Sequence, residues 1–224
     1  MNLKLDELFD NCAYKVVYTQ VGDSVNYAFV EEGDTLYIYF QGSNSISDWV
    51  RNFWFFKKPY KNMKISYYVH GGFLSAWKEV EDIISNKILE KVPLQDGHYD
   101  YKFKKIISVG YSHGGALSGL CHEFVWFNRP DIRNNIFGVG FESPRFYHGL
   151  FVKKKLKERW KNYIVIRNHF DIVTFLPPRL FLFTHVGTVC TLNQTSTANY
   201  KKPKCIGAHY PDKVLESLRE HYKK

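Results

Sequence analysis

The stretch KIISVGYSHGGALSGL, residues 105–120, decides how the rest of the sequence is interpreted. It begins as a β-branched run, passes through the pattern G-x-S-x-G at residues 110–114, and continues into small residues that suit a helix. A sharp strand-to-helix turn needs both glycines, because side chains two residues before and after the serine would collide. Ser112 is therefore a candidate nucleophile on such a turn. An ordinary glycine-rich turn stays open as the alternative, since glycine and serine are common there.

Strand and helix patterns alternate on both sides of this stretch. Two β-rich runs in residues 25–43 flank the turn residues Glu31 to Asp34, which predicts an antiparallel hairpin near the N-terminus. Apolar residues at helical spacing predict a helix with one buried face, formed by Phe73, Trp77, Val80, Ile84 and Ile88. Further strands are expected at residues 104–110, 135–141 and 163–168, with a helix at 116–128 and a basic helix at 150–162. Pro211 suits the start of a last helix, whose apolar face is Val214, Leu215, Leu218 and Tyr222. This order predicts an α/β fold with helices on the faces of a sheet.

Length and charge restrict the class of protein. The chain has 224 residues and 45% apolar content, enough to bury a substantial core, and no linker divides it. We therefore expect one domain over residues 1–224. The net charge of +9 favours anionic surfaces, such as phospholipid headgroups or nucleic acid. Because no recognisable nucleic-acid-binding motif is present, no specific nucleic acid is expected as a partner.

Targeting signals and metal patterns are not found. Acidic residues lie where a secretory leader would be apolar, so no signal peptide is expected. No apolar run reaches the length of a membrane span of about 18 residues, because Pro177, Pro178 and Arg179 interrupt the best candidate. These features favour a cytoplasmic protein, with secretion by another route or a removed leader left open. The four cysteines form no C-x-x-C pair, which disfavours zinc and redox sites and makes free thiols the default.

A catalytic serine needs two partners. Its hydroxyl is a weak nucleophile at neutral pH, so a histidine base and an orienting acid are required. Asp171 follows a β-rich run, and His209 lies in a predicted loop before the last helix. Taken singly, Asp171 could be a turn carboxylate and His209 a capping or surface residue. His185 is a rival base, although it lies within a predicted strand.

Several further motifs make the sequence similar to the class 3 lipases, the fungal lipase-like family of the α/β-hydrolases. Besides GYSHGG they are YFQGSNSISDWVRNFWF, VHGGFLSAW, GFESPRF, DIVTFLPP, HVGT and AHY, in the family's order over roughly residues 25 to 215. The resemblance implies an α/β-hydrolase fold with Ser112 as nucleophile, Asp171 as acid and His209 as base. It also implies an oxyanion hole made by Ser43 and the backbone N–H of His113. No metal or organic cofactor is implied.

The family pattern places a lid after the first oxyanion donor. Ile46, Trp49, Val50 and Phe53 fall at i, i+3, i+4 and i+7, the spacing of a short helix with one apolar face. Such a helix could cover the site, contact acyl chains and swing onto a lipid surface. The alternative is that this aromatic stripe belongs to the core.

Three features depart from the family pattern. Gln41 stands where relatives commonly have arginine, Glu142 stands where a small residue is usual, and the segment from Asp171 to His209 is compact. These departures affect the expected substrate more than the expected reaction.

The resemblance implies hydrolysis of carboxylic esters through an acyl-enzyme. The 17% aromatic content and the lysine-rich runs favour lipid esters and transient contact with an anionic membrane, so a lipase or phospholipase is expected. The alternatives are a small-ester carboxylesterase and a catalytically altered lipase-like protein that binds lipid or nucleic acid. The sequence does not indicate an oligomeric state.

Overall fold

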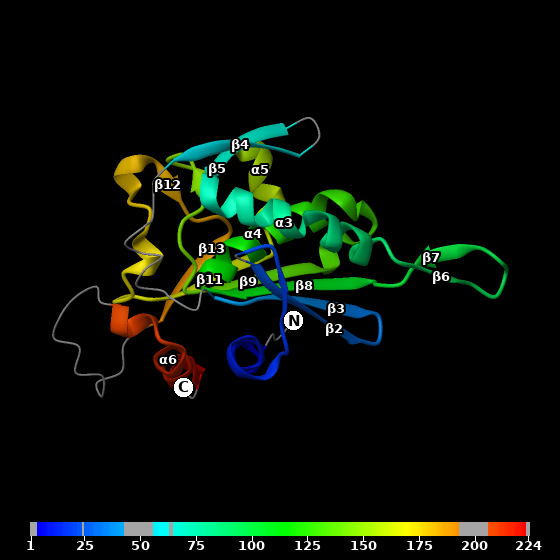
Figure 1. The fold of residues 1–224 in the computed structure, drawn as a ribbon, viewed down its shortest axis with the longest axis horizontal. Coiled ribbons are helices and arrows are strands. Elements are labelled where there is room, and N and C mark those ends of the chain that lie inside the picture. Colours follow the sequence, from blue (N-terminus) through cyan, green and yellow to red (C-terminus); the bar gives the residue numbers. More distant parts are fainter. Residues whose placement is uncertain (1–3, 24, 43–55, 63–64, 193–205, 223–224) are drawn as a thin grey trace.

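A seven-stranded sheet forms the centre of the part that this computed structural model describes, residues 4–23, 25–42, 56–62, 65–192 and 206–222 (Figure 1). The strands in spatial order are β1 (Thr19–Val21), β2 (Val25–Glu32), β3 (Thr35–Phe40), β8 (Lys105–Tyr111), β9 (Ile136–Phe141), β11 (Tyr163–Asn168) and β13 (Thr188–Leu192). β1, β2 and β3 pair antiparallel. From β3 to β13 every neighbouring pair is parallel. The predicted mostly parallel sheet and the hairpin around residues 31–34 are confirmed.

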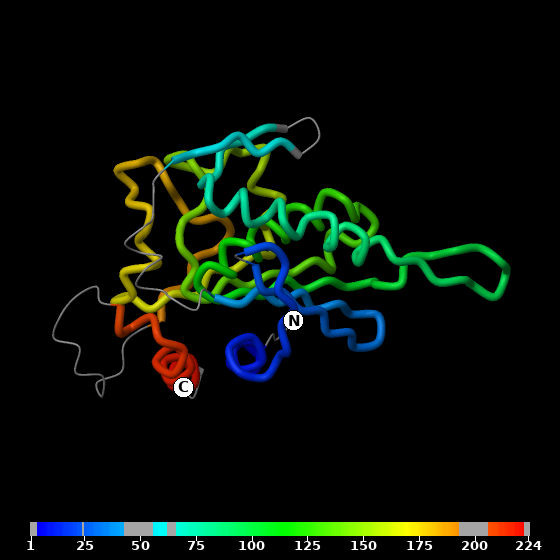
Figure 2. Tube along the Cα trace, viewed as in Figure 1, coloured from blue at the N-terminus to red at the C-terminus, as the bar shows by residue number. Residues whose placement is uncertain are grey.

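Helices cover both faces of this sheet (Figures 1 and 2). One face carries α3 (Gly71–Ile88) and α4 (His113–Asn128). The other carries α6 (Pro211–Tyr222) and α1 (Leu5–Asp10), which continues as a π-helical turn over Asn11–Lys15. Successive strand residues point to opposite faces, so Ile38 and Ile106 belong to the first core while Tyr39 and Ile107 belong to the second.

The helix α3 buries the face that its sequence predicts. Its five periodic apolar residues are each at most 1% exposed, and Trp77 packs edge-on against Phe124 of α4 at 5.5 Å between ring centroids. α4 is buried along almost its whole length and begins three residues before the predicted start at residue 116. Val214, Leu215 and Leu218 of α6 are buried as predicted.

A second sheet, which the sequence did not predict, covers α3 from outside (Figure 1). Its order is β12-β10-β5-β4, with β4 (Lys57–Asn62), β5 (Ile65–His70), β10 (Tyr147–His148) and β12 (Phe183–Thr184). The Tyr67 ring packs against Tyr147 and Trp160 at centroid distances of 5.7 and 5.6 Å. Residues of both sheets therefore share one core. A separate hairpin of β6 (Lys91–Pro93) and β7 (Tyr99–Tyr101) projects from the body.

The predicted basic helix at residues 150–162 is much shorter in the structure. The helix α5 covers Lys154–Lys157 and continues as a 3₁₀ turn, η3 (Glu158–Trp160), while residues 150–153 are not helical. Only Leu156, Arg159 and Trp160 are buried at helical spacing, which supports little more than one turn. Arg159 forms a buried ion pair with Glu123, and Trp160 Nε1 donates a hydrogen bond to the Gly119 carbonyl at 2.9 Å.

The remaining 3₁₀ turns connect these elements. They are η2 (Pro130–Asn135), η4 (Val173–Phe175), η5 (Arg179–Phe181) and η6 (Ile206–His209). None of the described helices combines the length and apolar character needed to cross a lipid bilayer. Of the described cysteines, Cys12, Cys121 and Cys190 are free thiols.

Candidate active site

Ser112 lies on a sharp turn between β8 and α4. Its backbone has φ +56° and ψ −124°, a positive-φ conformation that is uncommon for a residue with a side chain. A Cβ at Gly110 would lie 2.0 Å from the Gly114 carbonyl oxygen. A Cβ at Gly114 would lie 2.2 Å from the Phe40 carbonyl oxygen. Gly110 is therefore required by the turn itself, as the sequence predicts, and Gly114 is required because the end of β3 packs against it.

The structure brings Ser112, His209 and Asp171 together in one hydrogen-bonded chain. His209 Nε2 lies 2.7 Å from Ser112 Oγ, and His209 Nδ1 lies 2.5 Å from Asp171 Oδ2. All three side chains are at most 1% exposed. A proton on Nδ1 that is donated to the carboxylate leaves the lone pair of Nε2 directed at the serine hydroxyl. This is the arrangement in which a histidine can take the serine proton.

The rival histidine is placed elsewhere. β12 ends just before His185, and the His185 Nε2 atom lies 2.9 Å from the Thr174 carbonyl oxygen. That hydrogen bond ties His185 to the turn that follows Asp171, whereas the imidazole at the Ser112 hydroxyl is that of His209.

His113 occupies the first position of α4. The first backbone N–H groups of a helix lack partners within it, so the His113 N–H is available beside Ser112. Its imidazole packs against Phe73, and burial lowers the pKa of His113 to about 4, which keeps the ring neutral at pH 7. Ser43 and the predicted lid residues Ile46, Trp49, Val50 and Phe53 lie outside the described residues.

Tyr111 fixes the backbone of the base, a role that the sequence did not indicate. Its hydroxyl donates a hydrogen bond to the His209 carbonyl oxygen, and its ring stacks on the imidazole at 5.2 Å between centroids. On its other side, Tyr111 meets the edge of Phe9 from α1 at 5.6 Å. The base is thus held by the residue that precedes the nucleophile.

The acid is held by the turn that follows it. Asp171 Oδ1 accepts a hydrogen bond of 2.8 Å from the Val173 N–H, and the Asp171 carbonyl accepts one of 3.0 Å from the Thr174 hydroxyl. Oδ1 is therefore used to fix the carboxylate, while Oδ2 faces His209.

Glu142 adds a second buried carboxyl beside this acid. It is fully buried, has φ +48°, and accepts hydrogen bonds of 2.7 and 2.9 Å from the Asn168 N–H. Side-chain atoms of Glu142, Asp171 and His209 lie within 4.8 Å of one another. Burial and the Asp171 charge raise the pKa of Glu142 well above its ordinary value. A raised pKa favours the protonated form of Glu142, which can donate a hydrogen bond to Asp171.

These three groups also have the donor types of a metal site. However, the short contact between His209 Nδ1 and the Asp171 carboxylate requires a proton on that nitrogen rather than a lone pair directed at a cation. The arrangement therefore fits a shared hydrogen-bond network better than a metal centre.

The substitution Glu142→Gln should change how stability depends on pH. The pKa of Glu142 is raised in the folded protein, so its protonated form stabilises the fold. This contribution to the free energy of unfolding is fully present below about pH 4.5, the ordinary value, and is lost as pH rises toward the folded pKa. One proton corresponds to about 1.4 kcal/mol per pH unit. The amide does not titrate, so the variant should gain free energy of unfolding relative to wild type as pH rises. Urea unfolding at a series of pH values measures this difference.

The matched control is Glu158→Gln, which changes a carboxyl that is 68% exposed. The control should keep the wild-type pH dependence. Parallel curves for Glu142→Gln and wild type would contradict a protonated Glu142.

The sheet order and the strand–serine–helix turn define an α/β-hydrolase fold. The model of the family described as Lipase (class 3) matches residues 37–181, and the chain belongs to this family. A lipase of Rhizomucor miehei is 30% identical over 172 residues, covering 71% of this chain and 43% of that protein. A lipase of Rhizopus niveus is 31% identical over 168 residues, covering 68% and 37%. The chain thus spans less than half the length of these relatives.

A solved structure supports the same fold. It is titled as a triacylglycerol lipase whose catalytic centre is formed by a serine protease triad, and it superposes with a TM-score of 0.64. The match covers 86% of this chain and 78% of that chain at 23% sequence identity. At this identity the likeness is one of fold.

Proposed function

We propose that this protein is a serine hydrolase that cleaves carboxylic esters of lipids. The observation that supports this most strongly is the hydrogen-bonded chain from Ser112 through His209 to Asp171, at the turn where β8 meets α4. A buried serine hydroxyl 2.7 Å from an oriented imidazole is poised for nucleophilic attack. Membership of the class 3 lipase family supports the same reaction class.

The proposed reaction has two steps. His209 Nε2 takes the proton of Ser112 as Oγ attacks the ester carbonyl, and the alcohol leaves with that proton. Water then loses a proton to Nε2 and attacks the acyl-enzyme; the bond to Ser112 Oγ breaks, the acid is released, and Nε2 returns the proton to Oγ. Asp171 stays ionised and stabilises the imidazolium. We assign the oxyanion to the His113 N–H and to Ser43, of which one donor is typically worth about 3 kcal/mol.

Lipid esters are the favoured substrate class. Ile46, Trp49, Val50 and Phe53 are proposed to form a lid whose apolar face contacts acyl chains. The net charge of +9 would favour approach to an anionic lipid surface. The names of the related fungal lipases agree with this class. A phospholipid and a neutral acylglycerol both meet these requirements.

Labelling with a fluorophosphonate tests the proposal directly. The intact protein should gain the mass of one adduct, and Ser112→Ala should gain none. Ser217→Ala is the control, because this serine lies on α6 and its hydroxyl donates only to the Lys213 carbonyl at 2.8 Å. Absence of labelling in folded protein, with detergent or anionic vesicles present, would leave a binding scaffold as the better description.

A panel of p-nitrophenyl esters of increasing chain length separates the substrate classes. Rising kcat/KM with chain length supports a lipid esterase. Activity confined to the shortest esters would favour the small-ester carboxylesterase instead.

A further inference from the structure

Three arginines line one cavity beside the turn that follows Asp171. The cavity has a volume of about 450 Å³, and Arg145, Arg167 and Arg179 contribute to its wall together with Phe175, Thr184 and His185. These arginines come from three different places: the segment after β9, the end of β11 and the start of η5. The fold therefore gathers three permanent positive charges around one space.

Neutral groups, not acids, hold two of the guanidinium groups in place. Arg145 Nη1 donates to the carbonyl oxygens of Phe175 and Pro177 at 2.8 and 3.2 Å. Arg167 Nε donates to the Thr191 hydroxyl at 3.0 Å. Both guanidinium groups lie near the same Phe175 ring, with Cζ 5.6 and 5.3 Å from its centroid. Hydrogen bonds to neutral groups therefore fix the side chains of Arg145 and Arg167 in the cavity wall.

The positive charge of this cavity is not neutralised within the described part of the chain. There, the arginines that pair with a carboxylate are Arg129 and Arg159, and the three of the cavity do not. Burial and the two neighbouring guanidinium groups lower the pKa of Arg145 to about 10. Burial and the nearby arginines lower the pKa of His185 to about 3, so this ring is neutral. Glu142 acts on Arg167 from a distance, but its own raised pKa limits its negative charge.

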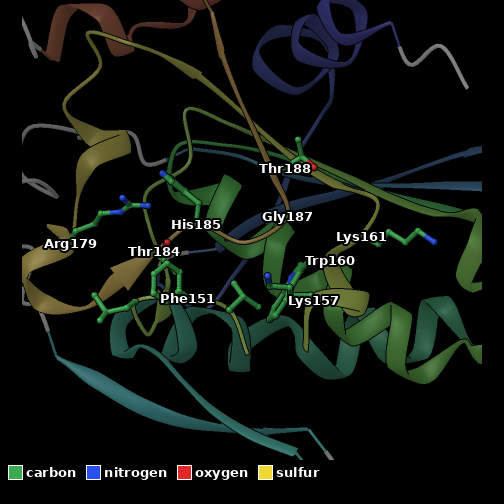
Figure 3. A pocket seen from close by; sticks show the side chains of 11 residues that line it. Phe151, Lys157, Trp160, Lys161, Arg179, Thr184, His185, Gly187 and Thr188 are labelled. Carbon is green, nitrogen blue, oxygen red and sulfur yellow. The ribbon is translucent and has the colours of Figure 1, made fainter. Parts of the chain in front are cut away.

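A second hollow, with a wall of mixed apolar and basic residues, adjoins the arginine cavity. The two share Arg179, Thr184 and His185, and the second has a volume of about 380 Å³ (Figure 3). Its wall adds Leu150, Phe151 and Trp160, with Lys157 and Lys161. Phe151 is 81% exposed and Leu180, next to Arg179, is 84% exposed. An anionic group with an attached hydrocarbon would therefore find complementary surfaces side by side.

We propose that the arginine cavity binds a phosphoryl group, carried by a lipid headgroup or by a free phosphate. A phosphate ester offers up to two negative charges and three acceptor oxygens, which match a cavity lined by three arginines better than a carboxylate does. Arginine is the residue suited to such planar, bidentate contacts. The site is separate from Ser112, so it adds a recognition element to the proposed ester hydrolysis.

The double variant R167Q/R179Q tests this assignment. Both side chains lose their charge, while Arg145 keeps its hydrogen bonds to the Phe175 and Pro177 carbonyls. The control is R133Q/R219Q, which removes the same net charge at exposed positions outside the cavity. Melting curves establish that each variant is folded. Because Arg179 is exposed, the single variant R179Q serves if the double variant does not fold.

Binding is measured in two arms without any ester substrate. Calorimetry with inorganic phosphate at constant ionic strength forms the first arm. Flotation with phosphatidylcholine vesicles, with and without phosphatidic acid, forms the second. We expect wild type and control to bind in at least one arm, and R167Q/R179Q to bind about ten-fold more weakly, as the loss of charge-assisted hydrogen bonds implies.

The arms distinguish the two sources of the phosphoryl group. Binding of phosphate supports a free ligand, and binding only to vesicles with phosphatidic acid supports a lipid headgroup. Equal binding by the double variant and its control, or no binding by wild type in either arm, overturns the proposal. Because no hydrolysis is measured, this result does not depend on whether Ser112 is catalytic.

Discussion

Replacing Ser112 by alanine is expected to lower kcat for ester hydrolysis by a factor on the order of 10⁶, the loss found when a triad serine is removed. The reason is that the proposed mechanism has no covalent intermediate without Oγ, so the oriented imidazole has no nucleophile to activate. Residues that act as a unit are not additive. The double variant Ser112→Ala/His209→Ala should therefore be no less active than Ser112→Ala alone. Steady-state kinetics with a p-nitrophenyl ester measure both.

The control for this experiment is Ser217→Ala, which should keep the wild-type kcat. A loss in Ser112→Ala smaller than about ten-fold, in folded protein, would contradict a serine nucleophile. A double variant far below the single one would indicate that His209 acts apart from Ser112.

Replacing Asp171 by asparagine should lower kcat by about 10⁴-fold, because the amide favours the wrong imidazole tautomer. The Asp171 Oδ2 atom now accepts a hydrogen bond of 2.5 Å from His209 Nδ1. An amide NH₂ placed there would donate to Nδ1 and move the proton to Nε2, which then cannot take the serine proton. The pH profile of kcat, recorded into the alkaline range, measures the loss.

Asp96→Asn is the matched control for the acid. Asp96 is exposed in the turn between β6 and β7, where Oδ1 accepts a hydrogen bond of 3.0 Å from the His98 N–H. This variant should keep the wild-type rate. If Asp171→Asn also kept it, Glu142 would be the candidate for the orienting acid, since it lies beside the same histidine.

The parts of the fold that could be predicted are those with a local pattern. The helical spacing in residues 73–88 predicts a helix, and the glycines around Ser112 predict a tight turn. The structure has both. The family resemblance then selected Asp171 and His209, which lie together although 38 residues separate them.

Other features depend on pairing between distant segments. β10 and β12 contain two residues each, too few for an alternating pattern. β10 pairs with the edge of β5, and β12 pairs in turn with β10. Glu142 was recognised as a departure from the family. The position of Glu142 beside Asp171 depends on a positive φ at this residue, which cannot be predicted from a glutamate in the sequence. The arginine cavity combines residues from two connections and from the end of β11, which no local pattern links.

The packing of α1 has a consequence for how long the base stays in position. α1 contacts α6, and its Phe9 supports the Tyr111 ring whose hydroxyl holds the His209 backbone. Partial opening at this face would release the imidazole while the parallel strands remained paired, because local openings cost less free energy than global unfolding. At elevated temperature, the time for which the proposed hydrolytic activity persists would then be limited by the detachment of α1 and α6 rather than by the unfolding of the sheet.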